Sequence, residues 1–326
     1  HDRFARKTLG NPSYASDFLK HYATPIILQF VDLDHLIAAP THYLSNELKE
    51  VILDVAFSAH LRDTKNGSDV LLFLEHKTHP SRFVPLQLGT HCFLSLYFGW
   101  TATKYSETYR PSIPLMILLY NGTEDIDEEI LFQSIFDEIP PELRALIPQF
   151  KIIVINMKRF RYGNLPGKPE TQAIAESLKR ATDGTFGDHI CDVLQHVKTA
   201  NLVRQQTLDL TTSITRYCTW TSNLDSDEIV QSITKVFPGT EGLEMETTIK
   251  KGFIQEAIEI GEARGIAKGR ASGKLETILD ILNDRFGQVP EDIVDALNQR
   301  TDEIALRSLA VHAANCSSLD DFAADL

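Results

Sequence analysis

VLLFLEHK, residues 70–77, is a run of five apolar residues that ends in Glu75, His76 and Lys77. An apolar run of this length predicts a strand. Residues two apart in a strand point to the same side, so Glu75 and Lys77 share a face. His76 points to the other face, where we expect it to be packed or exposed and not catalytic. The stretch therefore predicts a strand with a carboxylate and an ammonium group side by side at its end.

A second strand is predicted upstream, over residues 50–61, where apolar residues alternate along the chain. This alternation leaves Asp54 on the face opposite the main apolar row. Asn66-Gly67, between the two strands, is typical of a hairpin turn. A two-residue turn there would not bring Asp54 level with Lys77. We therefore predict a longer loop that sets Asp54 opposite Lys77, because a one-residue slip would turn the carboxylate to the wrong face.

Asp54, Glu75 and Lys77 together suit the hydrolysis of a phosphodiester. Mg²⁺ takes carboxylate oxygens, keeps several waters and binds substrate phosphate. Asp54 and Glu75 are therefore the predicted ligands, with the main-chain carbonyl of His76 as an additional one, and Mn²⁺ or Ca²⁺ would be other divalent ions for such a site. Lys77 is expected to position the attacking water or to neutralise the phosphate. The tripeptide alone is better explained as a surface ion pair, because Glu-x-Lys is a common chance string.

The order of the remaining patterns predicts an α/β fold with a mixed sheet flanked by helices. Helical spacing covers residues 2–9, 14–21 and 85–100, whereas continuous apolar runs predict buried strands over 114–120 and 151–156. Asn121-Gly122 ends the first of these two runs and is interpreted as a turn. We place this core in residues 1–165.

The chain after residue 165 is predicted to be helical. Residues 166–247 form a helical extension, and residues 248–326 form a long glycine-rich helix followed by a small helical module. The long helix carries glycines, several of them four residues apart, at Gly252, Gly261, Gly265, Gly269 and Gly273. Each costs about 0.5–1 kcal/mol relative to Ala, so these glycines form either a close-packing face or a flexible arm. Gly287 suits the position just after the helix, and the C-terminal helices are a candidate surface for a homo-oligomer.

Composition limits the class of protein. An apolar content of 43% is enough for a core, and no segment approaches twenty uninterrupted apolar residues, so we expect no membrane span. We recognise no signal peptide, and the four cysteines lack CxxC spacing, which argues against a zinc ribbon or a disulfide framework. The sequence therefore predicts a cytoplasmic protein with reduced cysteines.

The charge of the chain is unfavourable for a protein that binds DNA. The formal net charge is −13, whereas DNA binding is normally driven by Lys and Arg on phosphates. A local cluster of Lys158, Arg159 and Arg161 is the best candidate for phosphate contacts, although a solvated basic loop explains it equally well. The carboxylates between Asp125 and Glu129 lack the spacing of an EF-hand and are interpreted as the charged start of a helix.

Four segments together resemble the Rpn family of recombination-promoting nucleases, also known as YhgA-like putative transposases. They are HDRFARKTLGNPSYASDFLKHY (1–22), LKEVILDVAFSAHL (48–61), LLFLEHKTHP (71–80) and PLMILLYNG (114–122). The resemblance covers about residues 1–160, and each segment is weak evidence without the others. Arg6 stands where Lys is usual in the family, and Ala5 stands where Phe is usual.

The resemblance implies a PD-(D/E)XK restriction-endonuclease-like core and a Mg²⁺-dependent endodeoxyribonuclease with links to DNA recombination and mobile elements. It places the acidic position of the family on Asp54 and the Glu-His-Lys end of its next strand on Glu75–Lys77. Secondary candidates for the site are Glu47, Glu50, Gln87 and Asp2, of which Asp2 is also explained as a helix cap.

Two other functions fit the same sequence. A catalytically inactive relative that binds DNA, or a partner protein that assembles through its helical tail, is favoured by the acidic net charge. An enzyme that acts on RNA instead of DNA is a third interpretation. Mg²⁺ binding at the three named residues separates the enzyme from the scaffold, and a comparison of DNA with RNA separates the two substrates.

Overall fold

The computed structural model describes residues 2–43, 51–62, 69–79, 81–300 and 302–324. These fall into two compact units, His1–Ile249 and Lys250–Leu326. The first unit contains a mixed sheet and most of the helices, and the second is entirely helical where it is described. The domain boundaries that we placed at residues 165 and 247 stay predictions.

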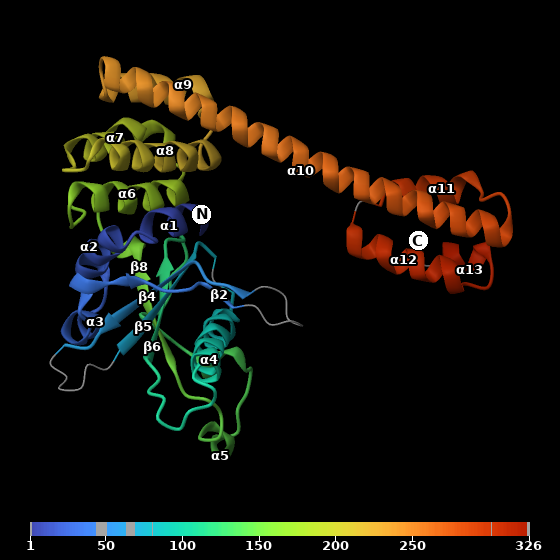
Figure 1. The fold of residues 1–326 in the computed structure, drawn as a ribbon, viewed down its shortest axis with the longest axis horizontal. Helices are drawn as coiled ribbons and strands as arrows, with labels where there is room; N and C mark the ends of the chain where they lie inside the picture. The colour runs from blue at the N-terminus through green and yellow to red at the C-terminus, as the bar shows by residue number, and fades with distance from the viewer. Residues whose placement is uncertain (1, 44–50, 63–68, 80, 301, 325–326) are drawn as a thin grey trace. The chain divides into compact units, whose positions relative to one another are not determined.

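A six-stranded mixed sheet forms the centre of the first unit (Figure 1). The strands, in their order across the sheet, are β1 (Ile37–Ala38), β4 (Val55–His60), β5 (Asp69–Lys77), β6 (Ile113–Tyr120), β8 (Lys151–Asn156) and β7 (Glu129–Leu131). β5, β6 and β8 are parallel, whereas β1, β4 and β7 each run antiparallel to a neighbour. The predicted α/β fold with a mixed sheet is therefore confirmed.

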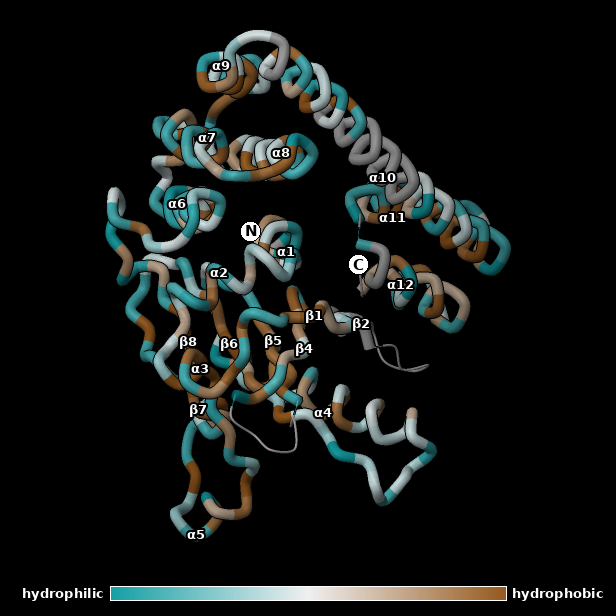
Figure 2. Tube along the Cα trace, turned by 60° about the vertical axis from the view of Figure 1, so that its left-hand side comes forward, coloured by the Kyte–Doolittle hydropathy of each residue, from teal (hydrophilic) through white to brown (hydrophobic). Residues whose placement is uncertain are grey.

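The central strands are buried because their sequences are almost wholly apolar, and Figure 2 shows this hydrophobic colouring along β4, β5 and β6. Helix α4 (Val84–Ala102) packs on the sheet and matches the helix predicted over residues 85–100. Phe73 of β5, Leu88 of α4 and Leu118 of β6 belong to one buried cluster. Figure 1 shows α4 on one side of the strands, with α2 (Pro12–Tyr22) and α3 (Pro25–Phe30) on the other.

The pairing of β4 with β5 corrects the predicted register. Val55 lies opposite Leu74, so Asp54 is level with Glu75 and not with Lys77 as we predicted. The connection is longer than a two-residue turn, as expected, since β4 ends at His60 and β5 begins at Asp69. The predicted register was wrong because the length of the loop was chosen to bring Asp54 to Lys77, and the observed pairing differs from it by two residues. A shift of two residues keeps every side chain on its predicted face.

The strand predicted over residues 50–61 is interrupted at Leu53 and Asp54. β3 (Val51–Ile52) pairs with β2 (His42–Tyr43) in a separate two-stranded sheet, whereas β4 pairs with β1 and β5. The chain therefore changes its pairing partner at Asp54, and this break sets the direction of the Asp54 main chain at the end of the large sheet.

Helices from both ends of the first unit pack together. Besides α2, α3 and α4, the α-helices of this unit are α1 (Asp2–Leu9), α5 (Pro141–Arg144), α6 (Pro169–Asp183), α7 (Ile190–Thr199), α8 (Arg204–Thr221) and α9 (Ser226–Val236). α6 and α7 pack on each other and on α8 (Figure 1). The ring of Phe4 in α1 stacks on that of Tyr217 in α8, with 4.3 Å between the centroids. The helical extension is thus part of the same core as the start of the chain.

The second unit is a helical module, as predicted for the C-terminal region. It contains the greater part of α10 (Thr240–Phe286), followed by α11 (Glu291–Asn298), α12 (Glu303–Asn315) and α13 (Leu319–Ala323). Gly287 has a φ of +84°, which suits a glycine just after a helix. Cβ atoms added at Gly269 and Gly273 would meet no described atom within 4 Å, which does not favour close packing there. Within the described ranges, no helix is long and apolar enough to cross a membrane.

Candidate active site

Asp54 and Glu75 meet where β4 begins and β5 ends. The Asp54 amide lies 3.4 Å from Glu75 Oε2, and the His76 amide donates to Asp54 Oδ2 at 2.9 Å. Asp54 is 4% exposed and Glu75 is 2% exposed. The structure therefore brings the two predicted carboxylates together in a buried position, where main-chain amides of both strands contact them.

Positive and polar groups from three elements compensate this carboxylate pair. Lys77 Nζ of β5 and Gln87 Nε2 of α4 each lie 2.7 Å from Glu75 Oε1. Arg6 Nη2 of α1 lies 3.1 Å from Asp54 Oδ1. Buried charges require such partners, because an unpaired carboxylate away from water is very costly. Two cations thus face two anions where α1, α4 and the sheet meet.

The start of α4 sets the position of Gln87. Pro85 lies in the first turn of the helix, where its missing N–H leaves no hydrogen bond unmade. Gln87 follows in the same turn, and its amide donates to the Phe83 carbonyl at 3.0 Å. The predicted secondary residue Gln87 therefore lies at the site, and its side chain holds one oxygen of Glu75.

His76 occupies the opposite face of β5, as the strand alternation predicts. Its side chain is fully buried, and Nε2 lies 2.8 Å from Asn121 Oδ1 at the end of β6. Asn121 Nδ2 in turn donates to the carbonyl of Leu178 in α6 at 2.8 Å. A Cβ added at Gly122 would lie 2.0 Å from the Thr78 carbonyl oxygen, so this close approach of β6 to β5 requires glycine. Our sequence analysis interpreted Asn121 only as part of a turn.

His91 lies one helical turn after Gln87 and was missed by the sequence analysis. It is 0% exposed, and neither ring nitrogen has a hydrogen-bond partner among the described residues. Burial lowers the pKa of His91, while the charge of Asp54 raises it and that of Lys77 lowers it further. The four-residue spacing from Gln87 was the signal in the sequence, since residues four apart share a helix face.

The structure does not test the remaining predicted ligands and secondary residues. Glu47 and Glu50 lie outside the described residues. Asp2 begins α1, and its side chain also lies outside the described part. The main-chain carbonyl of His76 stays a predicted ligand.

The predicted phosphate-contact residues lie beside an acidic loop. Lys158 Nζ is 2.7 Å from Asp125 Oδ1, and Arg159 forms an ion pair with Glu128. Arg161 is exposed. The acidic segment is a loop that leads into β7, so our prediction of a charged helix start was wrong. The ion pairs neutralise two of the three cations, which weakens the case for a DNA contact at this loop.

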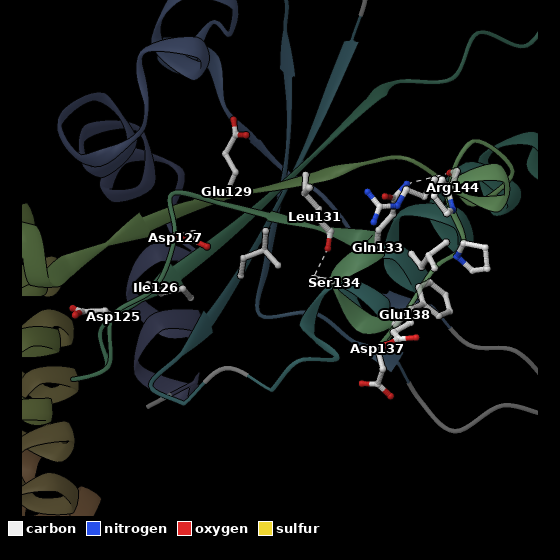
Figure 3. Close-up of a pocket in the computed structure, with 15 residues that line it drawn as sticks. Asp125, Ile126, Asp127, Glu129, Leu131, Gln133, Ser134, Asp137, Glu138 and Arg144 are labelled. Atoms are coloured by element: carbon white, nitrogen blue, oxygen red, sulfur yellow. Dashed lines mark hydrogen bonds between the residues drawn. The ribbon is translucent and has the colours of Figure 1, made fainter.

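A pocket of about 910 Å³ lies away from the carboxylate pair, around the segment from Asp125 to Arg144 (Figure 3). Ser134 Oγ donates to the Leu131 carbonyl at its wall, and Gln133 Nε2 donates to the Arg144 carbonyl. Its lining contains none of Asp54, Glu75 and Lys77. The volume of this pocket therefore does not point to the carboxylate pair, and the candidate site is chosen on the chemistry of Asp54 and Glu75.

The donor set at Asp54 and Glu75 fits a hard divalent cation. Two carboxylates on adjoining strand ends offer oxygen ligands, and Mg²⁺ is usually bound through one or two carboxylates, waters and substrate phosphates. Among the described residues, no three His, Cys, Asp or Glu side chains are grouped closely enough to hold a metal alone. A cation at this site would therefore depend on waters, main chain or substrate for its remaining ligands.

Comparison with known proteins gives one result for this chain. A family model described as "Putative transposase, YhgA-like" matches residues 1–208. The matched range begins with α1, includes the whole sheet and ends within α8. Neither the curated proteins nor the solved structures yield a match.

Proposed function

The chain belongs to the YhgA-like putative transposase family, and we propose that it is a metal-dependent DNA endonuclease with a PD-(D/E)XK core. Its reaction is the hydrolysis of a phosphodiester, and its role lies in DNA recombination or the movement of mobile elements. The observation that carries this proposal is the buried Asp54–Glu75 pair beside Lys77 at the ends of adjoining strands.

Each residue of the site has a distinct role in this proposal. Asp54 and Glu75, with the His76 carbonyl, would hold Mg²⁺ or a related divalent ion, which when bound supplies Lewis acidity and acidifies a coordinated water. Lys77 is a point charge beside Glu75 that neutralises the phosphate or positions the water. Gln87 fixes one Glu75 oxygen, so that the carboxylate keeps a single orientation.

A non-catalytic DNA-binding or protein-interaction relative is the second candidate. Arg6 and Lys77 already balance the charges of Asp54 and Glu75, as a purely structural cluster would require. The net charge of −13 also opposes tight binding of DNA. Metal binding decides between the two functions, because a structural cluster has no need of a cation.

The proposal is tested by incubating the whole chain with supercoiled plasmid in Mg²⁺, with EDTA in a parallel sample. We expect nicked circles with Mg²⁺ and none with EDTA, since hydrolysis needs the bound cation. A labelled RNA in the same buffer tests the other substrate. Intact plasmid at every Mg²⁺ and Mn²⁺ concentration, or equal nicking in EDTA, would refute the nuclease.

Arg6 is expected to compete with the cation for Asp54. Its side chain is 44% exposed, so the ion pair can open toward solvent. Exposed or half-exposed pairs contribute up to about 1 kcal/mol, which corresponds to roughly fivefold in affinity. Arg6→Gln should therefore tighten Mg²⁺ binding by up to about fivefold in calorimetry.

Arg3, which is exposed on the same helix, provides the matched control for Arg6. Arg3→Gln removes the same charge and should leave the Mg²⁺ dissociation constant unchanged. Weaker Mg²⁺ binding by Arg6→Gln would show that Arg6 supports the cation site instead of competing for it.

A further inference from the structure

His91 is a buried polar side chain whose hydrogen-bonding capacity is unused. It is 0% exposed, and both ring nitrogens lack a hydrogen-bond partner in the described part of the chain. Buried polar groups are almost always paired, and an unmet one points to a missing water or ion. An imidazole can serve such a partner as donor or as acceptor.

The position of His91 on α4 places its unused ring nitrogens on the side of the helix that faces the carboxylate pair. Gln87, four residues earlier, bonds Glu75 at 2.7 Å, and residues four apart lie on one helix face. Leu88 and Cys92 of α4 share a buried cluster with Leu53, the neighbour of Asp54. α4 also contacts β5, which carries Glu75 and Lys77. The helix face that supplies Gln87 therefore brings His91 to the same site.

Direct metal ligation by His91 does not fit the geometry. Among the described residues, His91, Asp54 and Glu75 do not form a three-residue metal cluster. A water between the imidazole and a cation explains both the unused ring nitrogens and the lack of a three-residue cluster among the described residues. Mg²⁺ keeps several of its waters when it binds to proteins.

We propose that His91 is a positioning residue that holds a water of the hydrated cation at the Asp54–Glu75 site. This inference rests on the proposed function, since it needs a cation there. In this arrangement His91 of α4 is a neutral hydrogen-bonding group, whereas Lys77 of β5 is a charged one. Outer partners of this kind typically change metal affinity by about 10–100-fold when removed.

Calorimetric titration of the whole chain with MgCl₂, without DNA, tests this role independently of cleavage. His91→Phe keeps a ring of similar size and removes both nitrogens, so the dissociation constant should rise about 10–100-fold. His91→Gln keeps a donor and an acceptor and should recover part of the affinity. Ser95→Ala is the matched control, since Ser95 follows one turn later and its hydroxyl donates to the Cys92 carbonyl of its own helix.

The outcomes separate the role of His91 from the proposed function. Unchanged Mg²⁺ affinity in His91→Phe, together with lost binding in Glu75→Gln, overturns the inference and leaves the nuclease intact. Mg²⁺ binding that Glu75→Gln does not weaken overturns both. If His91→Phe fails to fold, His91→Leu decides in its place, because it also removes both ring nitrogens. Mg²⁺ affinity equal to that of the unmodified chain would then again exclude a role for the imidazole. A nitrogen coupling in the electron spin echo spectrum of bound Mn²⁺ would indicate direct ligation and overturn the water-mediated arrangement.

Discussion

Glu75→Gln is expected to lower Mg²⁺-dependent nicking of supercoiled plasmid at least ~100-fold, because it removes the negative charge of a proposed Mg²⁺ ligand. Loss of a group that only contacts such a ligand already lowers metal affinity or activity by about 10–100-fold. The substitution keeps the size of the side chain and an oxygen that still accepts from Lys77 and Gln87, both 2.7 Å away. The fold should therefore survive, and far-ultraviolet circular dichroism would check it. The loss should appear in the rate at saturating Mg²⁺ as well as in the affinity for Mg²⁺.

Glu129→Gln is the matched control for this loss. Glu129 lies in β7, and its Oε2 is also 2.7 Å from a lysine, Lys151 of β8, but both side chains are more than half exposed. Removing this charge should leave nicking unchanged, because an exposed pair contributes little. Equal nicking by Glu75→Gln and the unmodified chain would exclude Glu75 as a ligand and with it the proposed site.

The carboxylate pair could be predicted because the strand patterns that place it involve only residues close together in the sequence. Strand periodicity alone placed Glu75 and Lys77 on one face and His76 on the other, and these faces are as predicted. The residue of β5 predicted to lie opposite Asp54 was wrong by two positions. The register depends on the length of the connection, which the turn signal did not give. Even so, the alternation of the strand kept the Asp54 carboxylate on the correct side.

The partners of the site were harder to predict because they come from distant parts of the chain. Arg6 is 48 residues from Asp54, and the sequence marked it only as a departure from the family pattern. His91 lies in an apolar helix and carries no sign in the sequence that its nitrogens would be unmatched. Contacts of this kind depend on how α1 and α4 pack on the sheet, which helical periodicity does not specify.

The helical extension after residue 165 is bonded to the strands of the candidate site. α6 follows that boundary, and its Leu178 carbonyl accepts from Asn121, which also bonds His76 of the site strand. The family match continues to residue 208, so it includes α6 and α7 along with the sheet. The helical extension therefore supports the strand from the face opposite Glu75, and cutting the chain after residue 165 would expose that face.

Asn121→Ala is expected to destabilise the first unit by about 3 kcal/mol, because it removes the buried bonds of Asn121 to His76 Nε2 and to the Leu178 carbonyl and opens a small cavity. The loss should appear as a lower free energy of unfolding in urea, read from circular dichroism. Asn156 provides the matched control, since it ends the neighbouring strand β8 and its side chain accepts from the nearby Lys158 amide at 3.0 Å. Asn156→Ala should cost about 1 kcal/mol, as for a lost local cap.

A double substitution tests whether the loss comes from the bond between Asn121 and His76. Replacing both partners by apolar groups is less costly than leaving one of them unmatched, so His76→Phe with Asn121→Leu should cost less than the two single changes added together. A coupling of at least ~1 kcal/mol is expected for residues in contact. Additive losses, or an Asn121→Ala loss no larger than that of Asn156→Ala, would show that α6 does not hold the site strand through this bond.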